Sequence, residues 1–226
     1  MKDVIRSRQI LSQDILKSYE KQDVATVHEA MGQKGAMTHS IRPIIPEMRC
    51  VGRALTVQCH SGDNLMLIKA VNMAQPGDVI VADMGNLLDN GPFGEILAVE
   101  CLTRGVSGLV LSTSIRDSQA IIDRKFSVFS AGVSVFGTSK ACKGMINHPV
   151  VVGGVLVQPG DLVLGDRDGV VVVPFAEAEL ILEAANRRRE KEAKVIQKLQ
   201  EGASLFDLYQ YQKVFVQLEI TEETEE

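Results

Sequence analysis

Charged side chains stand at both ends of one short stretch, from Gly94 to Asp117, in a chain of 226 residues. Glu95 precedes a segment of periodic apolar residues, and Arg116 and Asp117 directly follow an apolar run that ends at Ile115. Arginine binds a carboxylate through two parallel hydrogen bonds, and aspartate offers the hard oxygen that Mg²⁺ prefers. These three charged residues are therefore the candidate catalytic residues.

The start of the segment after Gly94 is a second candidate for anion binding. If the segment is a helix, its first backbone N–H groups, near Ile96 and Leu97, have no partner within the helix and can bind an anion. With Arg116 they suit an α-keto acid, whose keto oxygen a metal ion on Asp117 would polarise. The alternative interpretation of Arg116 and Asp117 is an ordinary solvated or ion-paired strand end.

A turn, a helix and a strand must position these groups. Gly105 ends the predicted helix, and residues 108–111 read as a buried strand. Ligand sites of α/β folds lie beyond the carboxyl ends of such strands, where Arg116 and Asp117 fall. The helix is predicted from apolar residues with helical spacing, which are Ile96, Leu97, Val99 and Leu102.

The rest of the chain predicts further helices and valine-rich strands. Strands separated by helices suit parallel pairing, whereas the closely spaced strands of residues 150–173 suit antiparallel hairpins. The predicted helices cover residues 5–19, 27–31, 65–73, 175–200 and 205–209, and the predicted early strands residues 41–45, 54–59, 79–82, 108–111 and 127–130.

These elements predict an α/β fold with a mixed sheet, in which parallel units come first, antiparallel hairpins come late and a long helix lies near the C-terminus. No linker rich in proline or serine interrupts the sequence. We therefore expect one domain over residues 1–210 and a C-terminal tail over residues 211–226, whose acidic end is disordered.

The composition of the chain argues against nucleic-acid and membrane partners. The formal net charge is −5, no dense basic stripe is present and tryptophan is absent, so nucleic acid is a poor candidate partner. No apolar run approaches the roughly 20 residues that span a bilayer, so no membrane partner is expected. The N-terminus lacks the apolar core of a signal peptide, and the four cysteines form no Cys-x-x-Cys pair. We expect a cytoplasmic protein.

Other cofactor chemistries have weak support. The four histidines lack zinc-ligand spacing, and no Gly-x-Gly-x-x-Gly indicates a dinucleotide or methyl-donor site. A glycine-rich run over residues 137–144 lacks the spacing of a phosphate loop. A Schiff-base lysine stays open, because Lys69 and Lys140 both lie in structured regions and nothing favours either.

Six short motifs occur in an order that resembles one superfamily. The chain resembles the class II 4-hydroxy-4-methyl-2-oxoglutarate / 4-carboxy-4-hydroxy-2-oxoadipate aldolases, which share a fold with the RraA-type ribonuclease regulators. The resemblance extends over about residues 20–210. The motifs are Val24-Ala25-Thr26-Val27-His28-Glu29-Ala30, Ser61-Gly62-Asp63-Asn64, Gln75-Pro76-Gly77-Asp78, Phe93-Gly94-Glu95-Ile96-Leu97, Ile115-Arg116-Asp117 and residues 166–172.

The resemblance implies an α/β/β/α sandwich assembled as a homotrimer or homohexamer, with Mg²⁺ or Mn²⁺ as cofactor. Asp117 would bind the metal directly, and Arg116 would bind pyruvate and polarise its keto oxygen. Metal-bound waters would be held by Glu29, Glu95 and Glu192 of the partner subunit. The substrate-binding residues would be Gly94, Glu95, Ile96, Leu97 and Arg116. The family pattern has Asp where this chain has Glu95, one methylene longer.

The implied reaction is metal-dependent retro-aldol cleavage of a 4-hydroxy-2-oxo diacid, which releases pyruvate, and the same enolate would permit oxaloacetate decarboxylation. A base, here a metal-activated water, would remove the proton of the alcohol. The alternative is a non-catalytic RraA-type regulator that binds a ribonuclease or another protein. The regulator branch of the superfamily has an acidic residue where this chain has Ala120, and this difference counts against the regulator alternative.

Overall fold

The computed structural model describes residues 2–85 and 87–221 and divides into two compact units, residues 1–185 and 186–226. The domain boundary predicted near residue 210 falls inside the second unit. The tail predicted from residue 211 begins with a helix, Tyr211–Gln217. The acidic end predicted to be disordered lies, over residues 222–226, outside the described residues.

The first unit is built on a mixed sheet of eight strands, seven of them in the order β1-β5-β4-β3-β2-β9-β10, with β6 beside β2. Neighbours β2, β3, β4 and β5 pair in parallel, while β1, β6, β9 and β10 pair antiparallel. The strands are β1 Arg42–Pro43, β2 Cys50–Gln58, β3 Asp78–Asp83, β4 Gly108–Ile115, β5 Val128–Val133, β6 Met145–Ile146, β9 Leu162–Asp166 and β10 Gly169–Val173.

A separate antiparallel hairpin, β7 Val150–Val152 with β8 Val155–Val157, completes the strands. The prediction of parallel units first and hairpins late is therefore confirmed. The described helices are α1 Gln13–Tyr19, α2 Val24–Ala30, α3 Leu65–Met73, α4 Glu95–Thr103, α5 Ser118–Asp123, α6 Ala178–Gln200, α7 Leu205–Leu208 and α8 Tyr211–Gln217, with a 3₁₀ turn over Phe175–Glu177.

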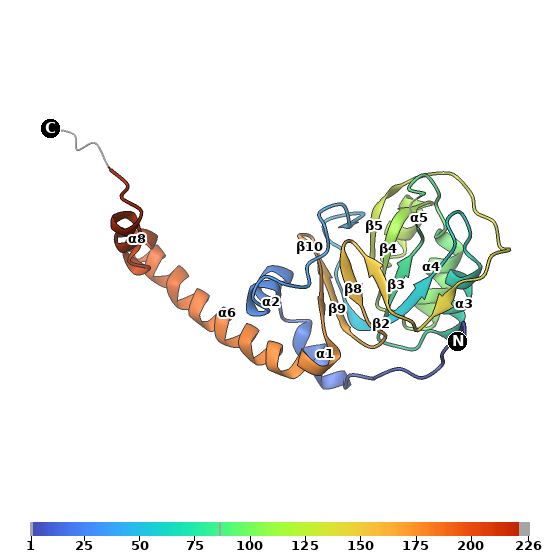
Figure 1. Cartoon of the computed structure of the whole chain (residues 1–226), viewed down its shortest axis with the longest axis horizontal. Helices are drawn as coiled ribbons and strands as arrows, with labels where there is room; N and C mark the ends of the chain where they lie inside the picture. The colour runs from blue at the N-terminus through green and yellow to red at the C-terminus, as the bar shows by residue number, and fades with distance from the viewer. Residues whose placement is uncertain (1, 86, 222–226) are drawn as a thin grey trace. The chain divides into compact units, whose positions relative to one another are not determined.

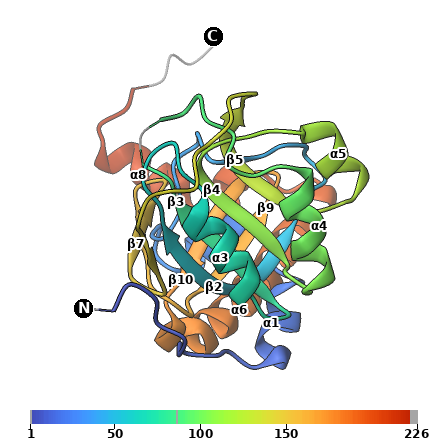
Figure 2. The ribbon, with the colours of Figure 1, turned by 90° about the vertical axis from the view of Figure 1, so that its right-hand side faces the viewer.

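Three hydrophobic clusters show how the layers of the first unit pack. One lies between the sheet and α3, α4 and α5, a second between the two halves of the curved sheet, and a third between β9, β10 and the segments of α1, α2 and the start of α6. Figure 1 shows α1 and α2 on the side of β9 and β10, and α3, α4 and α5 on the opposite side of the sheet. Successive residues of a strand point to opposite faces, so Ile80 joins the first cluster while Val79 and Val81 join the second. Figure 2 shows α3 and α4 in front of the sheet. These layers confirm the predicted α/β/β/α order.

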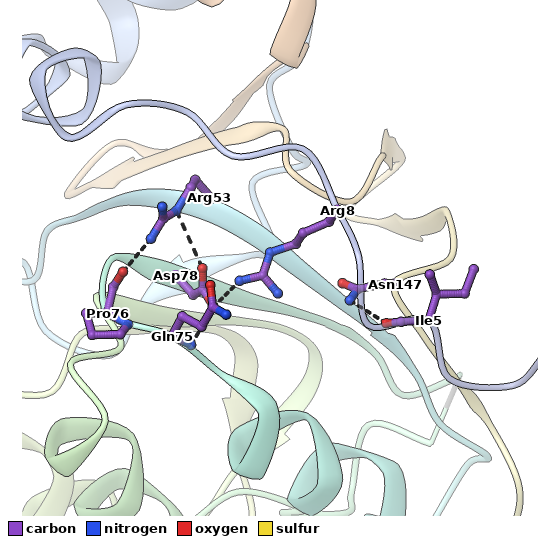
Figure 3. A network of polar contacts seen from close by, with 7 residues as sticks. All are labelled: Ile5, Arg8, Arg53, Gln75, Pro76, Asp78 and Asn147. Carbon is purple, nitrogen blue, oxygen red and sulfur yellow. Dashed lines mark hydrogen bonds and ion pairs between the residues drawn. The ribbon is translucent and has the colours of Figure 1, made fainter.

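The first predicted helix, over residues 5–19, is wrong in its first half, because α1 begins only at Gln13, after the N-cap Ser12. Residues before it run extended beside β6, where Val4 forms a bridge with Ile146. Arg8 then donates to the carboxylate of Asp78, whose side chain is fully buried (Figure 3). Arg8 and Asp78 are 70 residues apart in the sequence. Their buried ion pair therefore outweighs the local apolar spacing that predicts a helix before Gln13.

Two other predicted elements are shortened. The strand expected over residues 41–45 contains only β1, since Pro43 and Pro46 have no N–H to donate to a neighbouring strand. The long helix expected from Phe175 starts with a 3₁₀ turn, and its α-helical part begins at Ala178. Among the described residues, no helix is both long and apolar enough to cross a bilayer.

Candidate active site

Arg116 and Asp117 form the turn between the end of β4 and the start of α5. The backbone N–H of Arg116 donates to the carbonyl oxygen of Phe93 at 2.9 Å, so this turn is fixed against the chain that leads into α4. The register of β4 against β5 also shifts between Leu111 and Ser114, just before the turn. Such irregularities often re-aim side chains next to functional sites.

Asp117 has a left-handed backbone, with φ 56° and ψ 35°. Aspartate tolerates this conformation better than most residues, but it still costs free energy and often marks a functional turn. The conformation brings Oδ2 of Asp117 to 3.2 Å from the N–H of Glu95, at the start of α4. Nε of Arg116 lies 3.7 Å from the same oxygen. The predicted groups at the two ends of the stretch thus meet in space.

Gly94 is the N-cap of α4, and its missing side chain permits this approach. A Cβ at this position would overlap Oδ2 of Asp117 and lie 3.1 Å from Cγ of Arg116. The φ of Gly94 is −146°, which any residue can adopt, so close packing is the reason for glycine here. The first-turn N–H groups of Ile96 and Leu97 have no acceptor within the helix.

Two cavities meet at Arg116 and Asp117, because both residues line each of them. The wider cavity has a volume of about 690 Å³ and the narrower one about 130 Å³. Glu95 lines the wider cavity, whereas Gly94, Ile96 and Leu97 line the narrower one. The other residues of the wider cavity are Ser118, Gln119, Ala120, Val133, Ser134 and Val135.

The narrower cavity contains two polar residues that the sequence did not identify as site residues, Asn64 and Lys140. Asn64 is the N-cap residue of α3, yet its side chain makes no cap hydrogen bond. Instead Nδ2 of Asn64 donates to the carbonyl oxygen of Pro92 at 2.7 Å, and its buried Oδ1 has no partner among the described residues. Lys140 and Lys69 are the two candidates for a Schiff-base lysine, and Lys140 rather than Lys69 lines this cavity.

Glu95 has a partner that the sequence did not reveal. Its Oε1 accepts hydrogen bonds from Nε and NH2 of Arg124, at 2.9 and 2.6 Å. Arg124 is the C-cap of α5, so this pair joins the start of α4 to the end of α5. Both side chains are more than 40% exposed, and pairs of this kind add little to stability. One oxygen of the Glu95 carboxylate is therefore already engaged.

The two remaining predicted acidic residues do not line either cavity within one chain. Glu29 lies on α2, which packs against β9 and β10 at the other end of the strand order from β4. Glu192 lies on α6 in the second unit, where its Oε1 is 2.7 Å from Nε of Arg188. Their predicted contacts to metal-bound water stay predictions.

The donor set allows one direct protein ligand for a hard cation. Within the described ranges, no group of three or more His, Cys, Asp and Glu side chains could hold a metal ion. Asp117 uses Oδ2 for the N–H of Glu95, and its carboxylate lines both cavities. Mg²⁺ is commonly held by one or two carboxylates with waters and substrate oxygens completing the octahedron, so the residues present fit Mg²⁺ or Mn²⁺ and not zinc.

Solved structures share this fold. An uncharacterized protein from Pseudomonas syringae pv. tomato superposes with a TM-score of 0.78 at 28% identity, covering 89% of this chain and 95% of that one. The RNase ES inhibitor family member RraAS2 from Streptomyces coelicolor superposes with a TM-score of 0.75 at 24% identity, covering 84% and 98%. The second comparison supports the fold alone.

Sequence comparison agrees with the fold. A protein of Halalkalibacterium halodurans, provisionally named 4-hydroxy-4-methyl-2-oxoglutarate aldolase, is 34% identical over 176 residues, which are 78% of this chain and 84% of that protein. The model of the RraA-like family, described as Aldolase/RraA, matches residues 24–172, which contain α2 and the whole candidate site. The chain therefore belongs to the RraA-like family.

Proposed function

We propose that this protein is a divalent-metal-dependent aldolase that cleaves a 4-hydroxy-2-oxo diacid and releases pyruvate, and that it also decarboxylates oxaloacetate. The observation that carries the proposal is the meeting of Arg116, Asp117 and the start of α4 where two cavities join. The provisional name of the relative from Halalkalibacterium halodurans supports the same chemistry and suggests 4-hydroxy-4-methyl-2-oxoglutarate as the first substrate to test.

The pyruvate half of the substrate fits the narrower cavity. Its carboxylate would accept hydrogen bonds from the N–H groups of Ile96 and Leu97, at the positive end of the α4 dipole. Arg116 would donate to the keto oxygen, and Lys140 adds a second cation to the same cavity. The rest of the diacid would extend into the wider cavity, past Ser118 and Ser134.

The reaction breaks the bond between C3 and C4 as the C4 hydroxyl loses its proton, so that C4 becomes a carbonyl carbon and C3 keeps the electron pair. The guanidinium of Arg116 would stabilise the enolate oxygen of pyruvate, a charge that develops only as this bond breaks. Protonation at C3 then gives pyruvate. In oxaloacetate the same electron pair comes from loss of CO₂.

Asp117 would hold Mg²⁺ or Mn²⁺ directly, with Glu95, Glu29 and Glu192 of the partner subunit as the residues that hold its waters. The ion would supply Lewis-acid stabilisation of the enolate and an activated water as base. The left-handed turn and the Glu95 N–H fix the carboxylate of Asp117 before any ligand binds. The contribution of Glu192 from a partner subunit, in a trimer or hexamer, is carried over from the family resemblance.

The test is pyruvate release coupled to lactate dehydrogenase, with 4-hydroxy-4-methyl-2-oxoglutarate and oxaloacetate as substrates, in MgCl₂, MnCl₂ or EDTA. Metal without protein is the blank, since ions alone decarboxylate oxaloacetate. We expect metal-dependent release that Arg116→Ala lowers by about a hundredfold or more, the usual effect of losing one donor to a developing oxyanion. Asp117→Asn should also lose the metal-dependent release of pyruvate.

Arg104→Ala is the matched control, because Arg104 lies at the far end of α4 from the site and its guanidinium pairs there with Glu100. It should keep full activity. No pyruvate from either substrate above the metal blank would refute the aldolase and leave the regulator alternative, for which partner capture should persist in Asp117→Asn.

A further inference from the structure

Asp63 is a buried carboxylate whose role the proposed chemistry does not explain. It is 1% exposed and does not line either cavity. Its two oxygens accept four hydrogen bonds from other residues. They come from the N–H of Leu65 at 2.9 Å, the hydroxyl of Ser139 at 2.7 Å, and the N–H groups of Ala141 and Cys142 at 2.6 and 3.2 Å.

Three of these four donors come from the residues immediately around Lys140. The backbone adds two more hydrogen bonds between the same segments, from the N–H of Asn64 to Ser139 at 3.1 Å and from the N–H of Ser139 to Gly62 at 2.9 Å. The loop that carries Lys140 is thus fixed on both sides of the lysine, and Lys140 itself is one of the residues that line the narrower cavity.

The anchor for this loop is rigid. Leu65 is the first residue of α3, and α3 packs Leu67, Ala70 and Val71 into the main hydrophobic cluster. Asn64 extends the connection to the carbonyl oxygen of Pro92, two residues before Gly94. A continuous series of short contacts therefore runs from the Lys140 loop through residues 63 and 64 to the start of α4.

The charge of Asp63 is maintained at neutral pH. Burial raises the pKa of this carboxyl, but the hydrogen bonds from Ala141, Leu65, Ser139 and Cys142 together lower it by more than burial raises it, so that the pKa is about 2. Hydrogen bonds to an ionised acceptor are about twice as strong as neutral ones, so the contact to the loop is strongest in the ionised form.

We propose that Asp63 is a positioning residue that holds Lys140 in the cavity lined by Arg116, so that the two cations are set for an anionic keto acid before it binds. This inference rests on the proposed function. Fixing the lysine in advance removes an ordering cost that substrate binding would otherwise pay. Asp63 acts through Lys140 and touches no substrate.

The test compares Asp63→Asn, Lys140→Ala and the double variant in the full-length protein with Mg²⁺. The measurements are the Kd of oxalate by calorimetry, KM and kcat for pyruvate release, and hydrogen exchange of the amides of residues 139–142. We expect Asp63→Asn to raise the oxalate Kd and KM by about tenfold, and to change kcat much less. Exchange of the 139–142 amides should be faster.

The double variant is decisive, because residues that act through one another are non-additive. It should bind oxalate no more weakly than Lys140→Ala alone. Asp161→Asn is the matched control, since Asp161 is also buried and also accepts backbone N–H groups, from Gln158 and Phe175. It should leave the oxalate Kd unchanged.

Ser139→Ala covers the case in which Asp63→Asn does not fold, because it removes one donor from an exposed residue and leaves the carboxylate in place. It should raise the oxalate Kd about two- to threefold. An unchanged Kd in both variants, or additive losses in the double variant, would overturn the inference. Absence of pyruvate release by the unmodified protein would instead count against the proposed function, while oxalate binding and exchange would still test Asp63.

Discussion

At the scale of residues, the candidate site depends on how closely backbone and charged side chains approach one another. Asp117 reaches the start of α4 because its backbone is left-handed and because Gly94 has no side chain to block the carboxylate. Nε of Arg116 lies 3.7 Å from Oδ2 of Asp117. Because opposite charges at this distance attract, each side chain reduces the electrostatic free energy needed to place the other at the cavity. The geometry is specific enough that one added carbon should disrupt it.

We predict that Gly94→Ala will abolish most of the metal-dependent activity and destabilise the fold modestly. The new Cβ would overlap Oδ2 of Asp117 and press on Arg116, so the carboxylate must move. Overpacking of this kind costs about 1–3 kcal/mol. Urea unfolding and the pyruvate assay measure the two effects.

Gly32→Ala is the control for the change of residue type, because a Cβ at Gly32 meets no atom within 4 Å, although its φ of 68° adds backbone strain. It should lose stability without losing metal-dependent turnover. Full activity in Gly94→Ala would show that Asp117 does not need its observed position.

At the scale of elements, α4 and α5 are joined over the site by the pair between Glu95 and Arg124. The guanidinium of Arg124 neutralises a carboxylate that lines the wider cavity, beside the candidate metal ligand Asp117. The predicted contact of Glu95 to a metal-bound water stays a prediction, and the observed partner of its carboxylate is Arg124, in this ion pair. Its removal should therefore change cation binding more than stability.

We predict that Arg124→Gln will tighten Mn²⁺ binding by roughly threefold, because an exposed ion pair is worth about 0–1 kcal/mol and its loss leaves Glu95 uncompensated. Calorimetric titration with Mn²⁺ measures the change, and Arg104→Gln is the control with the same change of charge on α4. Weaker Mn²⁺ binding in Arg124→Gln would mean that Arg124 orients Glu95 for the metal rather than competing with it.

The connection between α3 and the loop at residues 139–142 predicts a pH dependence. The pKa of Asp63 is lowered, so its ionised form stabilises the folded protein at every pH above its ordinary value near 4. That stabilisation is lost as the pH falls from about 4 to about 2. Asp63→Asn should reduce the free energy of unfolding by about 2–3 kcal/mol at pH 7, the scale of a hydrogen bond to a charged group.

The difference between the unmodified protein and Asp63→Asn should shrink as the pH falls toward 2, because protonation of Asp63 removes the charge that Asp63→Asn lacks at every pH. Urea unfolding followed by circular dichroism between pH 2 and pH 7 measures it. A difference that stays constant over this range would show that the hydrogen bonds, and not the charge of Asp63, account for the stability.

At the scale of the whole molecule, the N-terminal segment is tied to the centre of the sheet by buried charges. Asp78 begins β3, accepts the N–H of Gln75 at 2.8 Å and faces the guanidinium groups of Arg8 and Arg53 (Figure 3). Nε of Arg53 lies 3.6 Å from Oδ1 of Asp78. All three side chains are at most 7% exposed, so the carboxylate balances charge that water cannot reach.

We predict that Asp78→Ala will destabilise the protein by about 3–5 kcal/mol, because it leaves two buried arginines without their anion. The midpoint of urea unfolding measures the loss. Glu100→Ala is the control, since it breaks a half-buried pair with Arg104 that is far more accessible to water than Asp78, and it should cost less than about 1 kcal/mol. Equal effects of the two substitutions would contradict the role of burial.

The sequence by itself determined the layers and the position of the candidate site. The continuous apolar runs of β3 and β4 are typical of strands buried on both faces, and this pattern is local, so it can be read without the fold. The same holds for Arg116 and Asp117, because a charged pair after a buried strand must emerge at the sheet edge. The helix start at Glu95 follows Gly94 as predicted, but the apolar residues that predicted the helix, Ile96, Val99 and Leu102, are exposed, and the helix buries Ala98 and Cys101 instead.

Only the tertiary structure decided which side chains meet there. Arg124 pairs with a residue 29 positions away, and the loop of Lys140 is held by a carboxylate about 77 positions away. The extended N-terminal segment likewise follows from Arg8 and Asp78, 70 positions apart, and not from its own apolar spacing. Such contacts leave no periodic signal, because their energy comes from charge and hydrogen bonding between segments that become neighbours only when the chain folds.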